Sequence, residues 1–253
     1  MKRIFLALIL IPLLASGGQS VNTGGRRKLF TPSGPPATAC GSSVTGVLAD
    51  YWARSNSSSP LSAWSDSSVN VNNLTATGSP TWANNTFGAG LAGVGFSGSG
   101  QYFSASTATI PASSFGNLSF YAVVNFAATN VALTSNHGGN KSYVIQLNSS
   151  NKLELDNQNT AALCTSTSTL STGTVYEIAF IANGSSCSLY VNGTSVNTSS
   201  YSSVPNAGVD RFGTNWGGTP TNSFNGSIYE AIFSSSTSYQ SGAHTCWTAL
   251  GLP

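Results

Sequence analysis

The segment from Ser188 to Phe233 constrains the fold more than any other part of this chain. Asn and Gly adopt positive φ angles with little strain, so Asn-Gly pairs between apolar runs are typical of tight turns. One run ends at Asn192-Gly193, a second ends near Gly213, and a third follows Asn225-Gly226. The segment therefore predicts short antiparallel strands joined by turns. Its three motifs are S-L-Y-V-N-G at 188–193, R-F-G-T-N at 211–215 and S-F-N-G-S-I-Y-E-A-I-F at 223–233.

The middle of the chain alternates apolar and polar residues, which is the pattern of strands with one buried face. In 175–182 both alternating sets are largely apolar, so we expect that strand to be covered on both sides. About twelve strands in two sheets is the natural count for this pattern. We expect a short helix only at 244–250. The alternating runs are 118–126, 143–147, 152–156, 175–182 and 187–191.

The N-terminal residues predict export. Residues 1–17 have the three parts of a signal peptide: a charged start, an apolar run of 12 residues and a small-residue cleavage site. That run is shorter than the roughly 20 residues that span a bilayer. Residues 18–39 are rich in Gly, Pro and Ser with a basic triplet, and predict a linker. We therefore expect an extracellular or cell-surface domain at 40–253, with no membrane insertion after signal cleavage.

Composition and charge exclude two classes of protein. The chain is 40% hydrophobic and 10% aromatic, which is enough for a sizeable core and argues against disorder. Residues 40–253 carry four basic and seven acidic side chains, a net charge of −3. Nucleic-acid binding needs a concentrated basic face, so the sequence predicts no nucleic-acid partner.

The order and spacing of several short motifs resemble the laminin-G-like, concanavalin A-like lectin and glucanase group over residues 44–250. This resemblance implies an all-β fold, a two-sheet antiparallel β-sandwich of the concanavalin A-like jelly-roll type. The motifs are W-S-D at 64–66, V-G-F at 94–96 followed by Tyr102, L-Y-V-N-G at 189–193 and F-N-G-S-I-Y-E at 224–230.

Four cysteines in an exported chain suggest two disulfides, with three possible connectivities. We favour Cys164–Cys187, because both lie in or beside predicted strands with one strand between them. We favour Cys40–Cys246 as the second pair, because the first and last segments of a jelly roll often lie side by side.

The resemblance raises the question of catalysis, because laminarinase-type glycosidases share this fold. They carry an E-x-D-x-x-E signature, and retaining members need two carboxylates about 5 Å apart. Here Glu154 and Asp156 share a strand face, but the third acid is replaced by Asn159. No G-x-S-x-G serine-hydrolase motif occurs either. We therefore assign no catalytic residue and predict that the chain is not an enzyme, with a divergent glycoside hydrolase as an alternative.

Two loops have the side chains with which jelly-roll lectins hold sugars. Planar amides match the fixed hydroxyl groups of a sugar, and an aromatic ring matches its apolar C–H face. Trp216 beside Gly217-Gly218 is the candidate platform, although its ring could equally fold back over the sandwich edge. The ligand-binding candidates are Asn136, His137 and Asn140 in one loop, and Asp210, Arg211, Asn215 and Trp216 in the other.

Relatives in this group often bind Ca²⁺ through loop carboxylates. The candidates here are Asp66, Asp156 and Asp210, which are far apart in sequence and form no D-x-D-x-D-G cluster. A Ca²⁺ site therefore stays an alternative, and no other cofactor is expected.

These observations predict an exported, non-catalytic recognition domain that binds glycans or a cell-surface or virion protein, as a lectin or in cell adhesion. The alternative from another class is a structural or decoration β-sandwich on a virion or cell surface, with no small ligand.

Overall fold

A computed structural model describes residues 39–253 except 57, 89, 107–116, 138–142, 158–160, 201–208 and 216–221. The predicted signal peptide and all of the predicted linker but Ala39 lie outside the described residues. Within those described residues, no helix combines the length and the apolar character needed to cross a bilayer.

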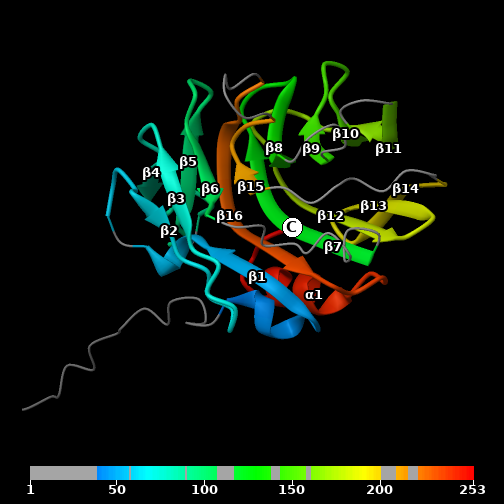
Figure 1. Cartoon of the computed structure of the whole chain (residues 1–253), viewed down its shortest axis with the longest axis horizontal. Helices are drawn as coiled ribbons and strands as arrows, with labels where there is room; N and C mark the ends of the chain where they lie inside the picture. The colour runs from blue at the N-terminus through cyan, green and yellow to red at the C-terminus, as the bar shows by residue number, and fades with distance from the viewer. Residues whose placement is uncertain are drawn as a thin grey trace, which may run out of the picture. The chain divides into compact units, whose positions relative to one another are not determined.

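The fold is a sandwich of two antiparallel sheets, as the sequence predicted (Figure 1). The strand order in sheet A is β14-β13-β12-β7-β16-β5-β4, with β1 also paired to β16. The strands of sheet A are β1 (Val47–Trp52), β4 (Thr81–Ala83), β5 (Gly93–Ser97), β7 (Asn117–Phe126), β12 (Val175–Asn183), β13 (Ser186–Val191), β14 (Thr194–Ser200) and β16 (Asn225–Ser234).

Sheet B has the order β11-β10-β9-β8-β15-β6-β3-β2. The described residues thus contain sixteen strands rather than about twelve. The difference is largely explained by β2, β3, β4 and β6, which have two to four residues each and are too short for alternation to reveal. The strands of sheet B are β2 (Ala63–Trp64), β3 (Leu74–Thr77), β6 (Tyr102–Ala105), β8 (Val131–His137), β9 (Tyr143–Leu147), β10 (Lys152–Asn157), β11 (Ala161–Thr169) and β15 (Val209–Phe212).

The alternation read from the sequence defines the core between the sheets. One face of β7 enters this core with Leu118, Phe120, Ala122, Val124 and Phe126, all buried. The opposite face of β7 and β12 enters a second apolar cluster on the outer side of sheet A. The prediction that residues 175–182 are covered on both sides is therefore confirmed.

Two short helices cover the outer side of sheet A. The 3-10 helix η1 (Cys40–Ser43) contacts the C-terminal helix α1 (Ser241–Ala249), which is the helix that the sequence placed at 244–250. A disulfide between Cys40 and Cys246 joins these helices across 206 residues of sequence. The Cys164–Cys187 disulfide joins β11 to β13, and so links one sheet to the other. Both are the pairings favoured from the sequence.

The two Asn-Gly pairs behave differently. Asn192 and Gly193 have φ angles of 48° and 73° and form the turn between β13 and β14, as predicted. Asn225-Gly226 was predicted to precede a strand, which is wrong, because it forms the first two residues of β16. Glycine is needed there because the β7 backbone comes so close that a Cβ atom on Gly226 would lie 2.1 Å from the carbonyl oxygen of Asn125.

Candidate functional site

A row of side chains, most of them polar, crosses the outer face of sheet B, and two of its members, Ser135 and Val144, are buried. Residues directly opposite each other on paired strands project to the same face. The register places Arg211 on β15 opposite Ser135 on β8 and Ser104 on β6. It continues through Val144 on β9 to Asp156 on β10. The sheet B face is the surface formed by these five residues together with Glu154, Gln146 and Tyr102.

Arg211 is the basic centre of the sheet B face. Its guanidinium carbon lies 5.4 Å from the centre of the Tyr102 ring, a cation–π distance. The Thr134 hydroxyl donates a 2.9 Å hydrogen bond to the Arg211 carbonyl, which fixes the backbone. Within the described part of the chain, the Arg211 Nε is buried with no hydrogen-bond acceptor and the side chain has no carboxylate ion partner. Because Arg211 as a whole is only half-buried, part of its side chain stays accessible to a ligand, although the Nε atom itself does not.

Glu154 lies on the same face with a carboxylate held in place by three donors. Its oxygens accept hydrogen bonds from Gln146 Nε2 at 2.8 Å, Asn148 Nδ2 at 2.9 Å and Thr165 Oγ1 at 3.2 Å. These neighbours come from β9, the turn after it and β11. The carboxylate is therefore oriented by its own sheet.

Asp156 lies two residues further along β10, on the same side as Glu154. A rise of about 3.4 Å per residue puts their Cα atoms about 7 Å apart. Partial burial raises the pKa of Asp156, and the negative charge of Glu154 raises it further. The sheet B face therefore carries two unlike carboxyl groups, one fixed by three donors and one that holds its proton more tightly than an ordinary aspartate.

Asp210 and Asn136 were predicted as loop residues, but the structure places them in strands β15 and β8 with buried side chains. Asn136 Nδ2 donates to Asp210 Oδ1 at 3.1 Å, and the Tyr143 hydroxyl donates to the same oxygen at 3.3 Å. Burial, and then the charge of Asp210, raise the pKa of Tyr143 well above its usual value. The loop prediction was wrong for these two residues, and also for His137 and Arg211, because the pairing of β8 with β15 extends through all four positions.

Of the other predicted ligand residues, three lie in the described part of the chain and two lie outside it. Arg211 joins the sheet B face, and Asn215 lies half-buried just beyond β15. His137 is the last residue of β8. Asn140 and Trp216 lie outside the described residues.

The three candidate metal ligands are on different parts of the fold. Asp66 lies in the loop after β2, Asp156 on β10 and Asp210 on β15. The Asp66 carboxylate accepts four hydrogen bonds, from the Asp50, Ser68 and Asn72 amides and the Ser68 hydroxyl, at 2.8–2.9 Å. Across the described ranges, no group of three or more His, Cys, Asp or Glu side chains could hold a metal ion. The structure therefore does not bring Asp66, Asp156 and Asp210 together.

Sequence reasoning missed a buried acid pair on the outer side of sheet A. Glu230 on β16 has no carboxylate neighbour in sequence, yet it is hydrogen-bonded to Asp50 on β1. Burial, and then the charge of Glu230, raise the pKa of Asp50 to about 9. Trp247 Nε1 and the Gly41 amide donate to Glu230 at 2.6 and 3.2 Å. Burial raises the pKa of Glu230 as well, so the pair as a unit retains a proton at neutral pH.

A second buried acid, Glu177 on β12, was also missed. It forms an ion pair with His244 on α1 and accepts a 3.3 Å hydrogen bond from the Tyr239 hydroxyl. Burial is the largest effect on the pKa of Glu177 and raises it, while the contacts with His244 oppose that rise. This pair attaches α1 to sheet A, which agrees with a structural role for His244.

The fold and sequence match a known protein family. Residues 97–238, more than half of the chain, match the family described as the concanavalin A-like lectin/glucanases superfamily. The chain therefore belongs to this superfamily. A comparison with curated protein sequences gave no significant match.

Three solved structures illustrate the likeness in fold. Domain 4 of AbnA, a GH43 extracellular arabinanase from Geobacillus stearothermophilus solved in complex with arabinotriose, has 16% identity and a TM-score of 0.62, over 79% of this chain and 98% of that domain. Trypanosoma rangeli sialidase in complex with sialic acid has 15% identity and a TM-score of 0.58, over 80% of this chain.

The binding domain of Paraclostridial Mosquitocidal Protein 1 has 12% identity and a TM-score of 0.58, over 79% of this chain. The match spans only 32% of the sialidase and 51% of the mosquitocidal protein chain. At these identities the likeness shows the fold alone.

Proposed function

We propose that this protein is a non-catalytic glycan-binding module and that the sheet B face holds the glycan. The observation that carries the proposal is the Arg211–Tyr102 pair, in which a half-buried guanidinium without a carboxylate partner among the described residues lies over an aromatic ring. A sugar hydroxyl would accept from the accessible part of the guanidinium, and the part of the Tyr102 ring that the guanidinium leaves uncovered offers an apolar surface for C–H groups.

The spacing of charges on the sheet B face favours an oligosaccharide over a single sugar. Three strand spacings of about 4.8 Å separate β10 from β15, so Asp156 and Arg211 are about 14 Å apart across the sheet. The carboxyl groups of Glu154 and Asp156 accept hydrogen bonds at one end, and the guanidinium donates them at the other. A chain of hydroxyl-bearing rings matches such a polar row.

The structural neighbours support a glycan ligand of this kind. Domain 4 of the arabinanase was solved with arabinotriose, a trisaccharide, and 98% of that domain aligns with this chain. That ligand belongs to the neighbour, and it indicates arabinose-containing oligosaccharides as the first probes for this protein.

The test is binding of the full chain to a glycan array, followed by calorimetry with the best oligosaccharide. Arg211→Ala should weaken binding about tenfold or more, because it removes charge-assisted hydrogen bonds. Arg54→Ala is the matched control, since Arg54 lies over the Trp52 ring away from the sheet B face. Equal affinity of wild type and Arg211→Ala, or no glycan bound at all, would refute the proposal and favour a structural module.

A divergent glycoside hydrolase is the second candidate, favoured by the two unlike carboxyl groups on β10. Retaining glycosidases need one ionised carboxylate and one that carries a proton, and the pKa of Asp156 is raised. The three hydrogen bonds to Glu154 favour glycan binding over hydrolysis, because they keep the carboxylate oxygens in contact with neighbouring side chains of the sheet. Hydrolysis of arabino- or β-gluco-oligosaccharides that disappears in Glu154→Gln would establish the enzyme in place of the binding module.

A further inference from the structure

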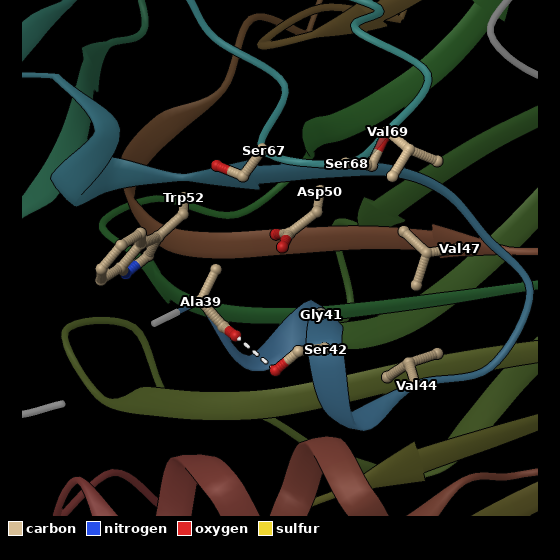
Figure 2. Close-up of a pocket in the computed structure, with 10 residues that line it drawn as sticks. All are labelled: Ala39, Gly41, Ser42, Val44, Val47, Asp50, Trp52, Ser67, Ser68 and Val69. Atoms are coloured by element: carbon tan, nitrogen blue, oxygen red, sulfur yellow. Dashed lines mark hydrogen bonds between the residues drawn. The ribbon is translucent and has the colours of Figure 1, made fainter. Parts of the chain in front are cut away.

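A pocket of about 570 Å³ opens on the outer side of sheet A, away from the sheet B face (Figure 2). Its wall on one side is β1, and the other sides are η1 and the loop at 67–69. This volume lies in the range of ordinary ligand pockets, which is about 300–1,000 Å³. Apolar side chains form most of its walls: Val44, Val47, Trp52 and Val69.

The carboxyl group of Asp50 forms the floor of this pocket. Figure 2 shows it between β1 and η1, and the residue is 4% exposed. Gly41 leaves room for it, since a Cβ atom there would lie 2.2 Å from Asp50 Oδ2. Asp50 Oδ1 has no hydrogen-bond partner in the described part of the chain. A buried carboxyl oxygen without a donor is costly, so this atom points to a missing ligand group.

Negative charge surrounds this unpartnered oxygen. Glu230 contacts Asp50 from β16, and Asp66 accepts the Asp50 backbone amide at 2.9 Å. Among the described residues, no basic side chain contributes to the pKa shift of Asp50, and the Arg54 guanidinium lies over the Trp52 ring at 5.9 Å from its centre. The field at the floor therefore favours a positive group.

The rim of the pocket is preformed. The Asp66 carboxylate bonds to the amides of Ser68 and Asn72, and so holds the loop that carries Val69. In this loop Val71 has a φ angle of 54°, which is strained for a β-branched residue and is held by those contacts. Val69 is 94% exposed at the rim. An apolar ligand stem could pack against it without reorganisation of the loop.

We propose that this pocket binds a primary ammonium group on an apolar stem, with the ammonium at the Asp50 carboxylate and the stem between the valines and Trp52. A divalent metal does not fit, because N–H donors occupy both oxygens of Glu230 and leave Asp50 as the single available carboxylate. An ammonium needs fewer ligands, and the nearby serine hydroxyls can accept its remaining protons.

The site predicts a distinctive pH dependence. Free Asp50 keeps its proton up to a pKa of about 9, so binding of an ammonium at neutral pH must release that proton. Affinity should therefore rise about ninefold from pH 7 to 8 and about fivefold from pH 8 to 9, while an alkylamine stays charged up to about pH 10. The other groups facing Asp50 are Glu230 and Asp66, with Tyr229, whose pKa is raised to about 12, and Arg54 nearby.

The experiment titrates the full chain with n-butylamine by calorimetry at pH 7, 8 and 9, in phosphate and in MOPS. The two buffers differ in ionisation enthalpy and report the released proton. n-Butanol is the matched control ligand, because it has the same stem without the charge. We expect butylamine to bind about tenfold or more tighter than butanol at pH 9, and about one proton to be released at pH 7.

Asp50→Asn is the decisive variant, because its amide can donate to Glu230 as the protonated carboxyl does. It should lose about tenfold or more of the butylamine affinity and all of the pH dependence, with glycan binding at the sheet B face unchanged. Equal binding of butylamine and butanol, or pH-independent binding to wild type, would overturn the proposal without bearing on the glycan site.

Discussion

The buried pair of Asp50 and Glu230 makes the stability of this protein depend on pH in a defined direction. Asp50 has a pKa of about 9 in the folded protein, because burial and the neighbouring Glu230 disfavour its charge. In the unfolded chain the pKa returns to about 3.9. The folded state therefore binds one more proton between these values. This contribution to stability is complete below about pH 4 and is lost as the pH rises through 9.

The slope follows from proton linkage. One extra proton in the folded state changes the free energy of unfolding by about −1.4 kcal/mol per pH unit. Between pH 6 and 8 wild type should lose about 2.7 kcal/mol from this pair. Asp50→Asn should lose nothing from it over the same interval, because an amide does not titrate and still donates to Glu230.

The assay is urea denaturation of both proteins at pH 6, 7 and 8 with the disulfides intact. The difference in unfolding free energy between variant and wild type should move by about 2.7 kcal/mol in favour of the variant. Asp156→Asn is a suitable control, since that carboxyl is only partly buried and its effect should be smaller. Parallel pH profiles for wild type and Asp50→Asn would refute the assignment of a shared, buried proton to this pair.

Two further predictions concern the contributions of the two disulfides and of two tryptophan hydrogen bonds to the free energy of unfolding. Replacing Cys40 and Cys246 by Ala should lower the free energy of unfolding by about 5 kcal/mol, and replacing Cys164 and Cys187 by about 3 kcal/mol, because the closed loops span 206 and 23 residues. Urea denaturation of the two double variants measures both losses. A larger loss for the Cys164–Cys187 pair would contradict the loop-entropy argument. Trp247→Phe removes a 2.6 Å donor from the Glu230 carboxylate and should cost about 2 kcal/mol. Trp82→Phe, which removes a donor to a neutral carbonyl of Ala53, should cost about 1 kcal/mol in the same melts, and equal losses would count against a charge-assisted bond.

Much of the fold could be predicted because the residues of each longer strand alternate according to which side of the strand is buried. In β7 the residues Phe120 and Val124 face one core and Tyr121 and Val123 the other, as the alternation indicated. The turn at Asn192-Gly193 was predictable for the same local reason, since both residues need positive φ angles. Asn225-Gly226 shows the limit of such signals. The same dipeptide serves there as the first residues of a strand, because the approach of β7 requires a glycine.

The candidate sites could be predicted less well from the sequence, because their residues come together only through the pairing of particular strands. Asp210 and Asn136 looked like loop residues until β8 and β15 paired and buried them. Arg211 and Asp156 share a face only because β8 and β9 lie between their strands with the register that is observed.

The sequence by itself determined the two-sheet fold, the faces of its longer strands and the terminal helix, because these follow from the local period of apolar residues and from turn chemistry. Only the tertiary structure decided that Asp50 and Glu230 share a proton. They are 180 positions apart in the sequence and meet because β1 pairs with β16. Their titration depends on burial and on each other's charge, and neither quantity exists until the chain has folded.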